Sequence, residues 1–345
     1  MNTDYHTAIV TEPGIIEFQE RALPELGTKD VLIKVKAASI CGSDLHVYKG
    51  KHPSAPLPVA VGHEVSGEVV RIGGIVSGVA LSDRVAVEPV IACGKCHFCL
   101  RGKYHLCTKI SFQYRQGQGG FAPYFVVNER WLHKLPEDIS YEEGALIEPL
   151  AVAIHAVTKG CISIGQTGAI FGAGAIGLLI LMVMKHAGVG DIFVVDIQDH
   201  RLEKAIALGA SSVLNNLNTD VVEQIFRMTN RLGVDKAFEA VGIEATLVQS
   251  LNVLKKGGTA VLAGIFERPE VYIPANVFVQ KEITLTGSQG YCWDFQEAVK
   301  FVEHNDVQLS QLITHVLPLG ELHDGFELLM DPKNNAIKVV IKVDH

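Results

Sequence analysis

The 345-residue sequence lacks a long apolar run, an excess of positive charge and a high density of cysteine. The mainly apolar stretch at residues 168–184 has 17 residues and includes four glycines, which is short for a membrane-spanning helix. Lysine and arginine number 30 against 38 aspartates and glutamates, and the net charge of −8 gives nucleic acid little electrostatic attraction. The first four residues lack the basic and then apolar layout of a secretory signal. These absences predict a soluble, cytoplasmic protein that binds neither membrane nor nucleic acid.

Seven cysteines are too few for a disulfide framework in a chain of this length, but four of them lie within 15 residues. This cluster consists of Cys93, Cys96, Cys99 and Cys107. Four thiolates complete a tetrahedral zinc site and leave no position open for a substrate. An iron–sulfur cluster is the chemical alternative, but the ferredoxin pattern has three residues before its fourth cysteine, whereas seven are present here. The spacing therefore predicts a zinc ion that stabilises a loop and takes no part in catalysis.

The residue pattern changes along the chain from a β-rich segment to an alternation of strands and helices. Residues 30–40 alternate apolar and polar side chains, as a half-buried strand does, and residues 140–143 have the form of a helix capping box. From about residue 167 apolar strands alternate with helices, which is typical of a parallel, doubly wound sheet. This alternation ends near residue 290, so we expect the last segment to rejoin the first domain.

The sequence thus predicts an α/β protein with two domains. A β-rich domain comprises residues 1–150 and 290–345 and carries the four-cysteine lobe at 91–109, and a doubly wound domain comprises residues 151–289.

A glycine-rich turn follows the first apolar strand of the doubly wound domain. Gly172-Ala-Gly174-Ala-Ile-Gly177 opens an apolar helix, whose N-terminal N–H groups are suited to bind a pyrophosphate. Asp196 ends the next strand, where a carboxylate can accept hydrogen bonds from ribose hydroxyls and repels a 2′-phosphate. The pattern predicts an NAD site in preference to an NADP site. Arg201 is either a neighbour of the adenosine or a solvated helix residue, and a glycine turn with Asp196 as a helix cap is the structural alternative.

A thiol, an imidazole and two carboxylates are scattered through the β-rich domain. They belong to Cys41, His63, Glu64 and Glu148. A catalytic zinc takes such groups as ligands while it keeps one position open to water or to an alcohol oxygen. Spacing along the chain does not show that these groups converge. A buried cysteine, a core histidine and a surface acid are the alternatives for the single residues.

Taken in order, these motifs resemble those of the zinc-dependent medium-chain dehydrogenases, especially the branch of sorbitol, threonine and butanediol dehydrogenases. The resemblance covers nearly the whole chain. It is carried by CGSDLH at 41–46, GHEVSGEV at 62–69, the four-cysteine segment at 93–107, EEGALIEPLAVAIHA at 142–156, the glycine turn and VVDIQDHRLEKAIALGA at 194–210. It implies a GroES-like catalytic domain, a Rossmann domain that binds NAD, two zinc ions per chain and a homotetramer or homodimer.

The resemblance also implies roles for single residues at the catalytic zinc. Residues that match Cys41 and His63 bind the metal, and in the polyol branch the acid that matches Glu64 joins them. The acid that matches Glu148 approaches the metal directly or through water, so the third direct ligand stays open between the two glutamates. Classical alcohol dehydrogenases have a cysteine at the position of Glu148, which places this chain with the polyol and threonine branch.

Further roles concern the proton, the nucleotide and the substrate. Residues that match Ser43 and His46 pass the alcohol proton outward, and imidazole titrates near neutral pH. Sorbitol dehydrogenases have an arginine before a late tyrosine, where this chain has Gly290-Tyr291, so sorbitol itself is in doubt. The expected nucleotide contacts, beside the glycine turn, are Ile176, Asp196, Arg201, Gly264 and Ile265.

The expected reaction is the oxidation of a secondary alcohol to a ketone, with transfer of a hydride to NAD. The alcohol is a polyol, a sugar acid or a vicinal diol, and zinc lowers the pKa of its oxygen. An L-threonine 3-dehydrogenase is the main alternative. A zinc-free reductase of quinones or enones and a non-catalytic NAD-binding protein are weaker ones.

Overall fold

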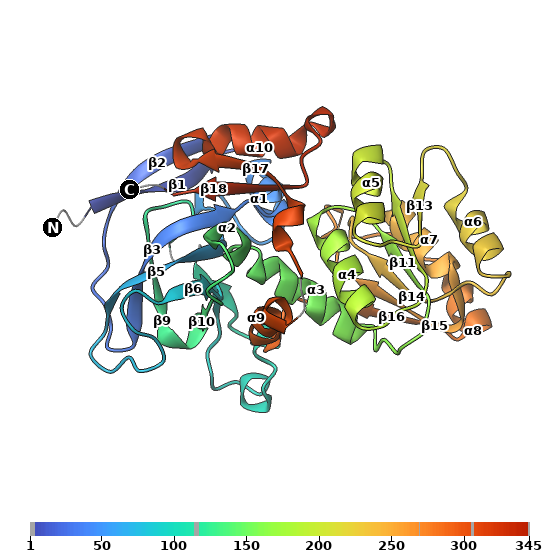
Figure 1. Cartoon of the computed structure of the whole chain (residues 1–345), viewed down its shortest axis with the longest axis horizontal. Coiled ribbons are helices and arrows are strands. Elements are labelled where there is room, and N and C mark those ends of the chain that lie inside the picture. Colours follow the sequence, from blue (N-terminus) through green and yellow to red (C-terminus); the bar gives the residue numbers. More distant parts are fainter. Residues whose placement is uncertain (1–3, 114–116, 269, 305–306, 344–345) are drawn as a thin grey trace. The chain divides into compact units, whose positions relative to one another are not determined.

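The computed structural model describes residues 4–113, 117–268, 270–304 and 307–343. The chain divides into two compact units, Met1–Glu148 with Phe295–His345 and Pro149–Asp294. In Figure 1 the first unit runs from blue to green and returns in red, and the second runs from green to orange. The limits expected from the sequence are 150 and 290, and the outer ends of the expected first domain, 1–3 and 344–345, lie outside the described residues.

The first unit is built on a mixed β-sheet in which the last strand of the chain pairs with an early one. Strands β17 and β18 are parallel, whereas β18 pairs antiparallel with β3, and β3 with β5 and β9. The spatial order is β10 (Leu132–Lys134), β6 (Arg84–Val87), β5 (Glu64–Ile72), β3 (Asp30–Ser39), β18 (Lys338–Lys342) and β17 (Ile313–Pro318), with β9 (Tyr124–Asn128) also paired to β3. The C-terminal segment therefore returns to the first unit.

The first unit also contains smaller elements. A sheet of β2 (Ile15–Ala22), β1 (Asp4–Glu12) and β4 (Val59–Ala60) lies in the same unit, and β7 (Val90–Ile91) pairs with β8 (Ser111–Phe112) on either side of the four-cysteine segment. The helices of this unit include α1 (Gly42–Tyr48), α2 (Tyr141–Gly144) and α10 (Leu322–Met330). The capping box at residues 140–143 is confirmed, because Ser140 accepts a hydrogen bond from the N–H of Glu143 and donates its own N–H to the Glu143 carboxylate.

The second unit is a parallel sheet with helices between successive strands. Its spatial order is β13 (Ser212–Asn215), β12 (Ile192–Asp196), β11 (Gly168–Phe171), β14 (Val234–Glu239), β15 (Leu254–Leu262) and β16 (Thr284–Gly287). The connecting helices are α4 (Ala175–His186), α5 (Asp199–Ala207), α6 (Val221–Met228), α7 (Glu244–Asn252) and α8 (Ala275–Lys281). Each pair of neighbouring strands is parallel, which confirms the doubly wound fold. The strand order reverses between β11 and β14, and ligands of such sheets bind at that point, beyond the carboxyl ends of the strands.

The apolar run at 168–184 is explained by this fold. Its first residues form β11, which is buried along its whole length, and the rest form the glycine turn and most of α4, whose residues 177–184 are buried. Both faces of the parallel sheet are covered, so its strands consist mainly of apolar residues. In the part of the chain that the structure describes, no helix combines the length and the apolar character that crossing a bilayer would need.

The chain passes from one unit to the other at two points, and both lie within helices. The first limit, between Glu148 and Pro149, falls inside α3 (Ile147–Lys159), and the second falls after the first residue of α9 (Asp294–His304).

Candidate metal and dinucleotide sites

Three of the scattered candidate ligands meet in the first unit. Cys41, His63 and Glu64 each offer one ligand atom, and these atoms lie within 4.8 Å of one another. Strand pairing explains the convergence: Ser39 at the end of β3 lies opposite Glu64 at the start of β5. Cys41 follows β3 by two residues and His63 immediately precedes β5, so both side chains reach the same place.

Glu64 presents its two carboxylate oxygens differently. The side chain is fully buried, and its Oε2 accepts hydrogen bonds from the hydroxyl of Ser39 and from Nζ of Lys338. Its Oε1 is buried without a hydrogen-bond partner among the described residues. A buried carboxylate oxygen is costly to leave unpaired. An unpartnered oxygen beside a thiol and an imidazole fits a zinc site that keeps an open position.

Asp44 supports the imidazole of this group and was not singled out by the sequence analysis. Its Oδ1 lies 3.3 Å from Nδ1 of His63 and accepts a 3.2 Å hydrogen bond from the N–H of Gly62. Its Oδ2 accepts a 3.0 Å bond from the N–H of Cys41. Burial by itself raises the pKa of Asp44, but His63 and these two N–H groups outweigh it and lower the pKa below its usual value. With Nδ1 engaged, Nε2 of His63 remains as the ligand atom.

The supporting role of Asp44 could have been predicted from its position relative to Cys41. An acid three residues after Cys41 occupies the third position of the helix that Cys41 precedes, where a carboxylate accepts backbone N–H groups. Lys338 was also missed, and its only local signal is a lysine at the start of an apolar strand.

Glu148 is placed near this group but outside it. The side chain is buried in the first turn of α3. Burial acts to lower the pKa of Lys338, but the charge of Glu64 and, to a smaller extent, the charge of Glu148 raise it. Its carboxylate does not belong to the group whose ligand atoms lie within 4.8 Å, as far as the described residues were compared. Ser43 and His46 lie three residues apart on α1 and therefore share one side of that helix.

The four cysteines form a second group. Their sulfur atoms lie within 4.8 Å of one another, with 3.5 Å between Cys96 and Cys99. Backbone N–H groups of Cys99 and Thr108 lower the pKa of Cys96 to about 5, which favours its thiolate, whereas burial and hydrogen bonds with Cys96 and Cys107 raise the pKa of Cys99 to about 12. The N–H groups of Cys93 and Lys109 point at the sulfur of Cys107, at 3.3 and 3.4 Å. Four converging sulfurs leave no open position and fit a structural zinc.

The glycine turn of the second unit has the geometry that a nucleotide site needs. Gly172 adopts φ +101°, and a Cβ on Gly177 would lie 1.8 Å from the carbonyl oxygen of Gly172, so only glycine lets α4 pack here. Gly174 precedes α4, and no side chain caps the first N–H groups of this helix. A Cβ on Gly174 would meet nothing within 4 Å. The helix start is therefore open to an anion.

Asp196 connects the turn to the end of β12. Its Oδ2 accepts a 2.6 Å hydrogen bond from the N–H of Ala173, and its Oδ1 accepts bonds of 2.8 and 2.9 Å from the N–H groups of Ile197 and Gln198. Arg201 is half-buried on α5, and its Nε has no hydrogen-bond partner in the described part of the chain. Ile176 is half-buried in the first turn of α4.

Glu239 organises the neighbouring loops and was also missed by the sequence analysis. It ends β14, and its Oε1 accepts hydrogen bonds from Val241 N–H, Gly242 N–H and the hydroxyl of Thr246, at 3.0, 2.9 and 2.7 Å. Its carbonyl oxygen accepts the N–H of Gly264 at 3.0 Å. Gly264 and Ile265 follow β15, so these expected nucleotide contacts lie at the same sheet edge as the glycine turn.

The whole chain is similar to known dehydrogenases. Residues 27–137 match the family described as alcohol dehydrogenase GroES-like domain, and residues 175–304 match the zinc-binding dehydrogenases. The chain is 34% identical over 338 residues to sorbitol dehydrogenase of Bacillus subtilis, covering 97% of this chain and 96% of that protein. It is 38% identical over 339 residues to probable D-xylulose reductase A of Neosartorya fischeri, covering 94% and 93%. The crystal structure of 2R,3R-butanediol dehydrogenase from Bacillus subtilis superimposes with a TM-score of 0.89 at 34% identity, covering 99% of this chain and all of the other.

The chain belongs to the zinc-dependent medium-chain dehydrogenases. The GroES-like and Rossmann architecture implied by the sequence is thereby confirmed. In this dehydrogenase the three-ligand group and the four-cysteine group both lie in the first unit, and the nucleotide-binding fold is the second.

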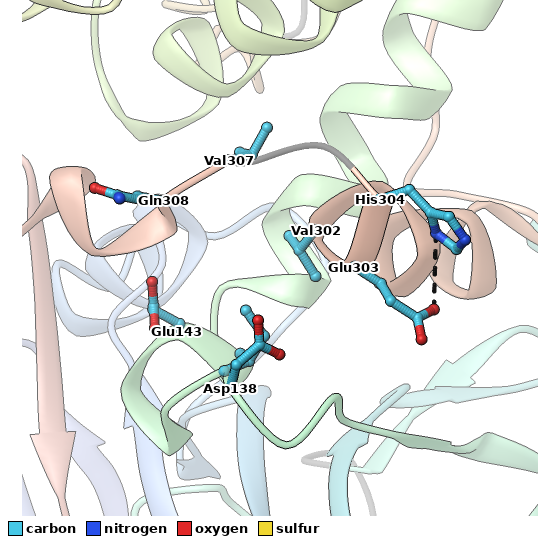
Figure 2. A pocket seen from close by; sticks show the side chains of 8 residues that line it. Asp138, Glu143, Val302, Glu303, His304, Val307 and Gln308 are labelled. Atoms are coloured by element: carbon cyan, nitrogen blue, oxygen red, sulfur yellow. Dashed lines mark ion pairs between the residues drawn. The ribbon is translucent and has the colours of Figure 1, made fainter.

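A surface pocket of this dehydrogenase contains none of these groups. It has a volume of about 440 Å³ in the first unit and is lined by residues near the start of α2 and the end of α9. Figure 2 shows Glu303 and His304 turned toward each other, with a carboxylate oxygen 3.8 Å from the ring nitrogen. Glu143 accepts the N–H of Ser310 at 3.1 Å. These polar groups are paired with one another or with the backbone, and we assign no role to the pocket.

Proposed function

We propose that this protein is an NAD-dependent zinc dehydrogenase that oxidises a secondary alcohol of the polyol, sugar-acid or vicinal-diol class to a ketone. The observation that carries this proposal is the convergence of Cys41, His63 and Glu64 within 4.8 Å in a chain of this family. His63 and Glu64 follow Cys41 by 22 and 23 positions along the chain. The fold alone gives no reason to bring a thiol, an imidazole and an unpaired carboxylate oxygen together. A metal-binding role gives such a reason, because zinc takes these groups as ligands.

In the proposed site Cys41, His63 and Glu64 hold the zinc, and the buried Glu148 does not bind the zinc directly. A zinc ion bound there supplies a Lewis acid that lowers the pKa of an alcohol oxygen. Asp44 keeps the imidazole of His63 oriented. The second zinc of each chain is held by the four cysteines and stabilises their lobe.

The proton of the alcohol is proposed to leave through α1. The hydroxyl of Ser43 can accept and donate a proton, and the imidazole of His46 lies on the same side of the helix. Imidazole is suited to carry a proton toward solvent because its unperturbed titration lies near neutral pH.

The proposed cofactor is NAD, bound at the glycine turn with Asp196 next to its ribose and with Ile176, Arg201, Gly264 and Ile265 around it. The carboxylate of Asp196 supports this choice, because a 2′-phosphate at that place would meet a negative charge. The open start of α4 is suited to the pyrophosphate.

The substrate class is supported by the relatives described above, whose names refer to sorbitol, xylulose and butanediol. These compounds share a hydroxyl or carbonyl next to a second hydroxyl-bearing carbon. Gly290 at the place of the family's arginine argues against sorbitol itself, and no observation favours threonine over the diols. A cytoplasmic homodimer or homotetramer is part of the proposal, and light scattering after size-exclusion chromatography measures the assembly.

A panel of polyols, sugar acids, diols and threonine, assayed by NADH absorbance, tests the function. We expect turnover of at least one polyol, sugar acid or vicinal diol, with NAD preferred to NADP. Zinc analysis should give about two ions per chain. Turnover that persists after a chelator has removed all metal would rule out the Lewis-acid role, and one zinc without any dehydrogenase activity would favour a non-catalytic NAD-binding protein.

A further inference from the structure

A buried lysine from the C-terminal strand lies against the three-ligand group. Lys338 is the first residue of β18 and is 3% exposed. Its Nζ donates a hydrogen bond to Oε2 of Glu64 and another, 3.1 Å long, to the carbonyl oxygen of Ile40. The antiparallel pairing of β18 with β3 places it there, because Val340 lies opposite Ser39.

Lys338 and Ser39 engage the same oxygen of Glu64. Both donate to Oε2, whereas Oε1 is buried and has no hydrogen-bond partner in the described chain. A carboxylate that is held through one oxygen has its plane and direction fixed, so the other oxygen points in a defined direction. Hydrogen-bond partners of this kind orient metal ligands and contribute to the affinity for the metal.

The charges of the site also call for a cation at this position. A thiolate on Cys41 and the carboxylates of Glu64 and Glu148 carry three negative charges, and a zinc ion neutralises two of them. The ammonium group of Lys338 interacts electrostatically with all three residues. Buried charges are tolerated when they are paired, and Lys338 provides a further positive charge next to these three groups.

We propose that Lys338 is a positioning residue of the catalytic metal site: together with Ser39 it fixes Oε2 of Glu64, so that Oε1 is presented to the zinc as a single-oxygen ligand. This inference rests on the proposed function. A lysine that only joined β18 to the end of β3 would affect the stability of the fold and leave the zinc affinity unchanged, so zinc affinity is the property that distinguishes the two roles.

The experiment is a competition between the zinc-loaded protein and a chromophoric zinc chelator, followed by absorbance. Wild type should release two classes of zinc, and the variant C41S identifies the catalytic class by lacking it. The test variants are K338M, K338R and S39A. The control is K342M, which removes a lysine of the same strand that is 51% exposed and pairs with Glu142 at the surface. Melting temperatures report on the fold of each variant separately.

We expect K338M to weaken the catalytic zinc by about 10- to 100-fold, as loss of a partner of a metal ligand typically does. S39A, which keeps the lysine, should weaken zinc binding at the catalytic site by about 3-fold or more. K338R should retain most of the wild-type affinity because arginine keeps the charge and the hydrogen-bond donors. The zinc of the four-cysteine site should be unchanged in every variant, and K342M should match wild type at both sites.

The outcomes separate this inference from the proposed function. If wild type binds only the zinc of the four cysteines, the proposed function fails and the role of Lys338 fails with it. If wild type binds both ions and K338M changes the catalytic affinity by less than about 3-fold, Lys338 is a structural residue only. If K338M does not fold, S39A and K338R decide: a weaker site in S39A with a near-normal one in K338R supports the proposal, and an unchanged S39A overturns it.

Discussion

Single buried carboxylates hold the geometry of both candidate sites. Asp44, Asp196 and Glu239 each accept two or more backbone N–H groups, and each stands at the end of a strand or in the first turn of a helix. Hydrogen bonds to charged groups are stronger than those between neutral groups. At the scale of the residue, therefore, the acids that shape these sites matter as much as the groups expected to touch zinc or nucleotide.

Asp44→Asn tests this point at the metal site. The amide retains an oxygen that can accept a backbone N–H, but it loses the charge that orients His63 and stabilises its N–H donor. We expect zinc affinity at the catalytic site and kcat/KM to fall by about 10- to 100-fold, with the four-cysteine zinc retained. Metal analysis and steady-state kinetics measure both quantities, and unchanged values would show that Asp44 serves only to cap α1.

At the scale of the element, the glycine turn performs two separable tasks. Gly177 lets α4 approach β11, since a Cβ there would overlap the carbonyl oxygen of Gly172, whereas a Cβ on Gly174 would meet nothing within 4 Å. Gly174 has φ −72° and ψ −175°, which any residue can adopt. The packing role and the ligand role therefore belong to different glycines of the same motif.

Gly174→Ala and Gly177→Ala form a matched pair that tests this separation. G177A should destabilise the second unit by several kcal/mol, about the cost of overpacking or more, and lower its melting temperature. G174A should fold like wild type and yet bind NADH at least about 10-fold more weakly, because the added methyl group lies where the pyrophosphate must approach the backbone. Calorimetry and NADH fluorescence titration provide the measurements. A G174A protein with normal NADH affinity would show that the pyrophosphate does not contact this turn.

Asp235 joins the loop before β11 to β14. Its carboxylate accepts the N–H and the hydroxyl of Thr167, both at 2.9 Å, and pairs with Lys255. Burial acts to raise its pKa, but Lys255 and Thr167 outweigh burial and hold the pKa below its usual value. The carboxylate therefore gives up its proton more readily in the folded state than in the unfolded chain.

Asp235→Asn should consequently show a pH-dependent loss of stability. A depressed folded-state pKa contributes stability that is fully present above about pH 4 and is lost as the pH falls through the folded-state value. We expect D235N to be less stable than wild type by about 1 kcal/mol at pH 7, a modest figure because Lys255 is partly exposed, and the difference should vanish in acid. Denaturant unfolding across this pH range measures it. Lys255→Met keeps the Thr167 bonds and should lose less, and a difference that grew in acid would contradict the assignment.

At the scale of the whole molecule, metal and nucleotide are assigned to different units. Both groups of metal-ligand candidates found among the described residues belong to the first unit, and the glycine turn and Asp196 belong to the second. Each unit has its own sheet, and the second has an apolar core around β11 and β14. The stability of the two units should therefore respond differently to the loss of metal.

Removal of the two proposed zinc ions by a strong chelator should abolish turnover and lower the melting temperature of the first unit, since a structural zinc contributes directly to folding. NADH binding should persist within about 3-fold, because the residues expected to hold it lie in the second unit. Calorimetry and NADH fluorescence on the same metal-free sample test both statements. Loss of NADH binding together with the metal would show that the two units do not act separately.

Much of the architecture follows from short-range patterns. The glycine turn, the four cysteines and the capping box at residues 140–143 are each defined within a few consecutive residues, and the alternation of apolar strands with helices is a local property as well. Steric limits on glycine and the tetrahedral preference of zinc act over such short segments. The doubly wound sheet and the grouping of the four cysteines could therefore be inferred from the sequence before any coordinates.

The groups that surround the proposed catalytic zinc could not be inferred in the same way. Cys41 meets Glu64 only because β3 pairs with β5 in one register, and Lys338 joins them only because β18 pairs with β3. A shift of one residue in either pairing would turn these side chains to the other face of the sheet. The sequence by itself determined which chemical groups the protein has and which local turns it forms. The tertiary structure alone decided which groups share a buried site, because strand register joins residues that are hundreds of positions apart.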